Sequence, residues 1–175
     1  MFKVLGISGS LRGASSNTAL LRAAMAVLPQ GIELTLFTGL AEIPAFNPDI
    51  ADEAAPASVM AFRGQVAAAD GVLFSSPEYA HGVPGSLKNA LDWLVGSGEF
   101  VDKPVALLSA RRAAFAYASL TETLSVMSAK IIPDACLTLG LTSNRMDEHV
   151  ILANAEFSDA LRAGMQAFGK AIASR

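Results

Sequence analysis

The sequence has little cysteine, no long apolar run and no cluster of basic residues. The one cysteine, Cys136, allows no internal disulfide, and no CxxC or Cys/His cluster typical of a zinc site is present. Although 52% of the residues are hydrophobic, none of the apolar runs reaches the roughly 18 residues that a membrane-spanning helix needs. Thirteen Lys and Arg against sixteen Asp and Glu give a net charge of −3, which argues against nucleic acid as a partner.

The N-terminus carries an apolar segment of about six residues, shorter than the roughly 7–15 of a secretory signal peptide. We therefore expect a cytoplasmic protein with no metal site and no membrane span. A length of 175 residues suits one domain over residues 1–175, with a core that needs no disulfide.

Short β-rich runs alternate with helical stretches along the chain. Several of the expected strands are apolar throughout, which is typical of parallel strands buried on both faces. The pattern therefore predicts an α/β fold, with a five-stranded parallel sheet between two layers of helices. The expected strands are Val4–Ser8, Ile32–Phe37, Gly71–Ser75, Pro104–Ser109 and one between Ala135 and Leu141; the expected helices are Ser16–Leu28, Pro56–Ala69, Gly85–Val95, Ala113–Met127 and Ala155–Ala173.

The loop after the first strand, SGSLRGASSN over residues 8–17, has the composition of an anion site. It leads into a helix, whose first N–H groups and positive dipole end attract negative charge. Arg12 adds a charged fork, and short neutral donors come from Ser10, Ser15, Asn17 and Thr18. A helix cap at Ser15, Ser16 or Asn17 accounts for only one of these side chains. No GxxxxGK[ST] or GxGxxG motif is present, so the loop suits a monophosphate such as that of FMN.

The loop after the third strand is rich in proline and glycine between Pro77 and Gly85. These residues favour a rigid turn at the carboxyl edge of the sheet, where backbone groups and the ring of Tyr79 can meet a planar heterocycle. Two motifs follow the first and third expected strands: GSLRxxSxN at Gly9–Asn17 and PEYxxxxPGxLKNAxDW at Pro77–Trp93. In both, the chain resembles the NAD(P)H-dependent FMN reductases, a flavodoxin-like group that includes quinone, chromate and azo-dye reductases.

The resemblance implies strand order 2-1-3-4-5, non-covalent FMN, NADPH or NADH as electron donor and a small-molecule electron acceptor. It also implies a homodimer or homotetramer with the flavin near a subunit interface. No catalytic side chain is needed, because the cofactor carries the chemistry. The cofactor-binding residues it implies are Ser10, Arg12, Ser15, Ser16, Asn17 and Thr18 around the phosphate, Pro77, Glu78, Tyr79, Ala80 and His81 around the ribityl chain and ring, and Ser109 at the end of the fourth strand.

The loop over Ser109–Tyr117 departs from the family, which usually has a Gly-Gly pair there. This chain has Arg111 and Arg112 instead, either as a site for the 2′-phosphate of NADPH or as a solvated pair. Because the residues of this loop are larger than glycine, we also expect a narrower flavin site than in other members of the family. Two other functions therefore stay open: a flavodoxin-type electron carrier, and a family member without cofactor that acts as a binding module.

Overall fold

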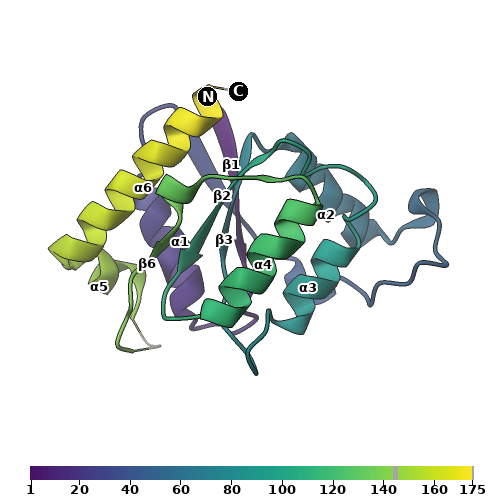
Figure 1. Ribbon diagram of the computed structural model, residues 1–175, viewed down its shortest axis with the longest axis horizontal. Coiled ribbons are helices and arrows are strands. Elements are labelled where there is room, and N and C mark those ends of the chain that lie inside the picture. Colours follow the sequence, from purple (N-terminus) through teal and green to yellow (C-terminus); the bar gives the residue numbers. More distant parts are fainter. Residues whose placement is uncertain (144–145, 175) are drawn as a thin grey trace.

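The computed structural model describes residues 1–143 and 146–174, and its centre is a parallel sheet (Figure 1). The neighbouring strands run in the order β2-β1-β3-β4-β5, and β6 also pairs with β4. This confirms the predicted flavodoxin-like parallel sheet and its strand order. The strands are β1 (Phe2–Ser8), β2 (Ile32–Phe37), β3 (Gly71–Ser75), β4 (Pro104–Ser109), β5 (Lys130–Ile131) and β6 (Leu137–Thr138).

Two short strands share the fifth position of the sheet: β6 lies where the fifth strand was expected, between Ala135 and Leu141, and β5 precedes it. Strand β5 pairs with Pro104 and Val105 at the start of β4, and β6 pairs with Leu108 and Ser109 at its end. Between them the chain leaves the ladder in a 3₁₀ turn over Pro133–Ala135. Proline has no N–H to donate to a neighbouring strand, so this position interrupts the edge.

Six α-helices are described, with short 3₁₀ turns in the connection between β2 and α2. The helices are α1 (Ser16–Ala26), α2 (Ala57–Ala68), α3 (Gly85–Asp92), α4 (Ala114–Val126), α5 (Glu148–Ala153) and α6 (Ala155–Ala173). Helix α3 ends before the expected Val95, and Trp93 follows it as the C-cap. Helix α5 was not expected from the sequence; the carboxylate of Asp147 caps it by accepting the N–H of Val150 at 2.9 Å.

The helices cover both faces of the sheet (Figure 1). Helices α2, α3 and α4 pack on one face, and α1, α5 and α6 pack on the other. Strand β3 serves both layers, since Val72 and Phe74 contact the first while Leu73 contacts the second. All residues of β3 and β4 are buried, which confirms the expectation from their apolar composition.

The register brings the carboxyl ends of three strands together. Ser8 of β1 lies beside Ser75 of β3, and Ser75 lies beside Leu108 of β4. The loops that follow these strands therefore leave the sheet at one edge. In the described residues, no helix combines the length and the apolar character needed to cross a bilayer.

Candidate functional site

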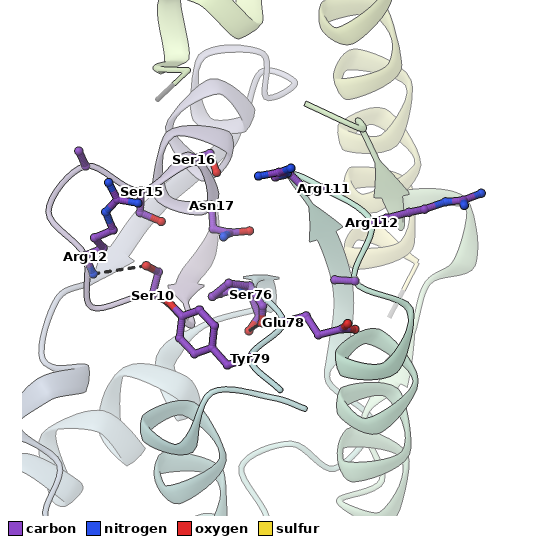
Figure 2. Close-up of a pocket in the computed structure, with 13 residues that line it drawn as sticks. Ser10, Arg12, Ser15, Ser16, Asn17, Ser76, Glu78, Tyr79, Arg111 and Arg112 are labelled. Atoms are coloured by element: carbon purple, nitrogen blue, oxygen red, sulfur yellow. Dashed lines mark hydrogen bonds between the residues drawn. The ribbon is translucent and has the colours of Figure 1, made fainter. Parts of the chain in front are cut away.

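Three loops enclose a cavity of about 350 Å³ where β1, β3 and β4 end (Figure 2). The volume lies within the range of roughly 300–1,000 Å³ that is usual for small-molecule sites. The cavity also lies at the point where strand order reverses between β1 and β3, which is where open parallel sheets bind ligands. Its lining residues are Ser10, Arg12, Ala14, Ser15, Ser16 and Asn17, then Ser76, Pro77, Glu78 and Tyr79, and finally Arg111, Arg112 and Ala113.

The loop after β1 is shaped by its own hydroxyl groups. Ser10 Oγ accepts the N–H of Arg12 at 3.3 Å, the bond drawn in Figure 2. Ser15 is the N-cap of α1, and its Oγ accepts the N–H of Thr18 at 3.5 Å. Asn17 is joined to β3, because its Oδ1 accepts the hydroxyl of Ser75 at 3.1 Å. The first turn of α1 is thereby held against the cavity, with N–H groups that have no carbonyl partner within the helix.

Gly9 allows this loop to approach β3 closely. Its N–H donates to the carbonyl of Ser75 at 2.9 Å. A Cβ at Gly9 would overlap Ser76 Oγ and lie 3.0 Å from the Leu87 side chain. The position therefore favours glycine for lack of space.

The loop after β3 contains a tight two-residue turn. Tyr79 and Gly82 exchange two backbone hydrogen bonds, of 3.0 and 2.9 Å, across Ala80 and His81. Both central residues are left-handed, with φ of +49° and +61°, as in a type I′ turn. The His81 ring stacks on Phe115 of α4, with ring centroids 4.3 Å apart and planes at 22°. That contact helps to hold a turn whose backbone costs about 1–2 kcal/mol for each residue other than glycine.

Glu78 joins this loop to α4. Its Oε2 accepts the N–H groups of Phe115 at 2.8 Å and Ala116 at 3.0 Å. Helix α4 has no side-chain cap from its own N-cap residue, Ala113, and no acidic residue in its first turn. A carboxylate from 37 positions earlier in the chain therefore caps it.

The cavity has an excess of positive charge. Arg12, Arg111 and Arg112 line it, although Arg112 directs its guanidinium away from the other labelled residues (Figure 2), and Glu78 is the single carboxylate among the described lining residues. Within residues 1–143 and 146–174, these three arginine side chains have no hydrogen bond or ion pair. Together with the first turn of α1, they make the cavity suitable for an anion.

Eight of the twelve residues expected from the sequence line this cavity, and four do not. The Thr18 hydroxyl donates to Ser8 Oγ at 2.9 Å, away from the lining. Ala80 and His81 form the turn beyond it. Ser109 is buried at the end of β4, beside a void of about 10 Å³. The lining residues that the sequence did not single out are Ala14, Ser76 and Ala113.

Tyr117 borders the same small void as Ser109. Burial is the main cause that raises the pKa of its hydroxyl above the usual value, and a hydrogen bond with Cys136 adds to it. Tyr117 is therefore neutral at ordinary pH. Cys136 Sγ in turn accepts the N–H of Leu107 at 3.3 Å, so the thiol belongs to the packing between β4 and α4.

A second hollow, of about 520 Å³, lies between the β2–α2 connection, α2 and the end of α3. Its lining includes Phe46 and Trp93, with the ion pair of Arg63 and Asp52 at 2.8 Å. Because that guanidinium is paired, the second hollow lacks the excess positive charge of the cavity at the sheet edge.

The fold and the cavity define a flavodoxin-like α/β protein with an arginine-lined cavity at the switch point of its sheet. The model of the NADPH-dependent FMN reductase family matches residues 2–143. The chain belongs to this family, which confirms the prediction from the two loop motifs.

Curated relatives agree with this assignment. The chain is 44% identical over 115 residues to an NAD(P)H-dependent FMN reductase of Pseudomonas aeruginosa, covering 65% of this chain and 62% of the relative. It is 38% identical over 105 residues to the quinone reductase of Escherichia coli K12, covering 59% of this chain and 54% of the relative. The match thus spans between half and two thirds of the length of these relatives.

A solved structure shows the same fold. The flavoenzyme NAD(P)H:(acceptor) oxidoreductase FerB of Paracoccus denitrificans superposes with a TM-score of 0.79, covering 99% of this chain and 98% of that one. At 24% sequence identity, this likeness concerns the fold alone.

Proposed function

We propose that this chain is an FMN-dependent NAD(P)H oxidoreductase, which passes electrons from a nicotinamide through bound FMN to a small acceptor. One observation carries the proposal: in a member of this family, a positively charged cavity lies at the first turn of α1, where strand order reverses. Such a cavity accepts a phosphate at one end and a planar ring along the neighbouring loops.

The phosphate of FMN would bind at the start of α1. The N–H groups of the first turn and the hydroxyls of Ser10, Ser15 and Ser16 offer donors to its oxygens. Arg12 would add a charge-assisted bond from the opposite side of the loop. Asn17 is 7% exposed and bonded to Ser75, so its main part would be to hold α1 in place.

The ring and ribityl chain would lie along the loop after β3. Pro77, Glu78 and Tyr79 line the cavity and would contact the cofactor, largely through backbone groups. The expected residues outside the lining would support the loops rather than contact the cofactor; these are Thr18, Ala80, His81 and Ser109. Thr18 fixes Ser8 at the end of β1, and His81 braces the turn against Phe115.

When bound, FMN supplies the redox chemistry, taking a hydride from the nicotinamide and giving electrons to the acceptor. The residues that line the cavity would hold it at the carboxyl edge of the sheet and orient it there. The described lining contains no histidine or cysteine, and its one carboxylate is engaged at α4. No side chain of the cavity is therefore assigned a proton-transfer step.

The loop with no glycine after β4 does not close the cavity, which keeps a volume of about 350 Å³ with Arg111, Arg112 and Ala113 in its lining. Ala110 and Ala113 are buried, at 1% and 8% exposure, and the larger residues between them are exposed arginines. The large groups of this loop are therefore the side chains of Arg111 and Arg112, which are exposed and can change conformation. This arrangement favours a cofactor-binding member of the family over a module that has lost its cofactor.

The proposal is tested by titrating FMN into the protein and following flavin fluorescence. Arg12→Ala is expected to weaken FMN binding by about tenfold or more, the loss of a hydrogen bond to a charged group. Arg162, exposed on α6 and outside the cavity, provides the control variant, Arg162→Ala. The proposal fails if the unmodified protein does not bind FMN, or if both variants bind it equally well.

Several features of the whole protein remain proposals of the same kind: a single domain over residues 1–175, a homodimer or homotetramer, and a cytoplasmic location. The acceptor class, whether quinone, azo compound, metal oxyanion or free flavin, is proposed only as a small molecule. Sedimentation velocity of the FMN-loaded protein tests the oligomeric state. Steady-state kinetics with one compound of each acceptor class test which acceptor is reduced.

A further inference from the structure

The turn after β3 has a backbone that residues other than glycine rarely adopt. Ala80 and His81 have φ of +49° and +61°, and within residues 1–143 and 146–174 no other two adjacent non-glycine residues both have positive φ. Such a backbone persists only where its surroundings determine it, and it is often found where a ligand is held. The turn directly follows Pro77 and Glu78, and its first residue is Tyr79; all three line the cavity. The contacts that hold the turn therefore bear on the cavity.

The first turn of α4 holds this loop at two points. The carboxylate of Glu78 accepts the N–H groups of Phe115 and Ala116, and the ring of Phe115 stacks on that of His81. Phe115 thus contributes its backbone to one contact and its side chain to the other. Because the N-cap residue, Ala113, supplies no side-chain cap, the start of α4 receives its cap from the loop after β3.

The same contacts determine where Tyr79 lies. Figure 2 shows Glu78 directed toward α4, whereas Tyr79, the next residue, extends toward Ser10. A shift of Glu78 would therefore also shift the ring of Tyr79 and the backbone that is proposed to contact the flavin ring. The phosphate end of the cavity is held in another way, because Asn17 joins α1 to Ser75 at the end of β3.

We propose that Glu78, His81 and Phe115 are positioning residues, which through the first turn of α4 set the place of the loop that holds the flavin ring. This proposal rests on the proposed function, because it concerns the ring end of the FMN site. When these contacts are lost, the loop occupies its binding position for only a fraction of the time, and the apparent affinity for the flavin falls by that fraction. The effect concerns the ring and ribityl chain, whereas Arg12 acts on the phosphate.

The experiment compares the unmodified protein with Glu78→Ala, Phe115→Ala and Phe115→Tyr, the last of which keeps the aromatic ring. Arg12→Ala provides the comparison at the phosphate end. Lys103→Met is the control for lost stability. Lys103 is 4% exposed and donates to carbonyls at the end of α2, and it lies just before β4, at the opposite edge of the sheet from the cavity.

Flavin fluorescence, at a temperature where each variant is folded, measures the affinity for FMN and for riboflavin. Riboflavin has the same ring and ribityl chain but no phosphate, so it reports on the ring end alone. Circular dichroism in the flavin absorption bands of the FMN-loaded proteins reports on the surroundings of the ring, which a loss of stability elsewhere in the fold does not change.

We expect Glu78→Ala and Phe115→Ala each to weaken FMN and riboflavin by one common factor, about three- to tenfold, and to change the flavin circular dichroism. Phe115→Tyr should behave like the unmodified protein, because a tyrosine ring can also stack on His81. Arg12→Ala should weaken FMN but not riboflavin. Lys103→Met should leave both affinities unchanged although it makes the fold less stable.

Three results would overturn the proposal: unchanged affinity and circular dichroism in Glu78→Ala and Phe115→Ala, a loss of affinity in these variants for FMN but not for riboflavin, or an equal loss in Lys103→Met. If Glu78→Ala does not fold, Phe115→Ala decides, because it keeps both N–H groups and the carboxylate. Failure of the unmodified protein to bind FMN refutes the proposed function and the positioning role together, whereas any of the three results with a protein that binds FMN refutes the positioning role alone.

Discussion

The carboxylate of Glu78 offers the most quantitative test of how the cavity is held together. It accepts two backbone N–H groups at the start of α4, at 2.8 and 3.0 Å, and α4 has no other side-chain cap. Loss of an N-cap side chain costs about 0.5–2 kcal/mol, and loss of a negative charge at a helix N-terminus costs about 0.3–1 kcal/mol. Glu78→Ala is therefore expected to lower the free energy of unfolding by about 1.5 kcal/mol, or roughly 3–6 °C in Tm.

Glu78→Gln separates the two contributions, because the amide keeps one oxygen acceptor and loses the charge. We expect it to cost about 0.5 kcal/mol, from the charge alone. Urea unfolding of both variants measures these values, with Glu122→Gln, exposed on the same helix, as the control. The reasoning is refuted if Glu78→Ala is as stable as the unmodified protein, or no less stable than the Glu122 control.

Three further predictions follow from buried groups around the sheet. Lys103 is 4% exposed and donates to carbonyls at the end of α2, at 2.6 and 2.7 Å, so Lys103→Met should cost about 1–3 kcal/mol in urea unfolding. The pKa of Tyr117 is raised in the folded state, so its stabilising contribution is complete below pH of about 10 and declines above it. Tyr117→Phe should then lose less stability than the unmodified protein between pH 9 and 11; an equal loss would contradict this. Gly9→Ala should cost about 1–3 kcal/mol by overlap with Ser76, with unchanged stability as the contrary result.

Local patterns in the sequence predicted most of the fold. Strands β2, β3 and β4 and helix α6 have the expected bounds, because each is a clear apolar or amphipathic run between turn residues. Strand β5 was missed, because a two-residue strand that is followed by Pro133 is too short to give a pattern in the sequence. Helix α5 was missed because it is only six residues long and begins with polar residues.

The residues near the cavity were predictable from the loop motifs, but their individual tasks were not. The partners of Glu78 are 37 and 38 positions away, and a sequence does not show which helix a carboxylate will cap. The direction of Arg111 depends on the path of the whole loop after β4. Ser109 was expected at the site from the family resemblance, yet it is buried at the end of β4, beside the small void.

The central claim is that the cavity holds FMN for reduction by a nicotinamide, and one absorption experiment tests it directly. The purified protein is incubated with excess FMN, desalted, and treated with NADPH or NADH without oxygen. We predict that a visible flavin spectrum is retained and then bleached by the nicotinamide. A retained spectrum that neither nucleotide bleaches would contradict the oxidoreductase function and favour an electron carrier, whereas a colourless protein would contradict FMN binding itself.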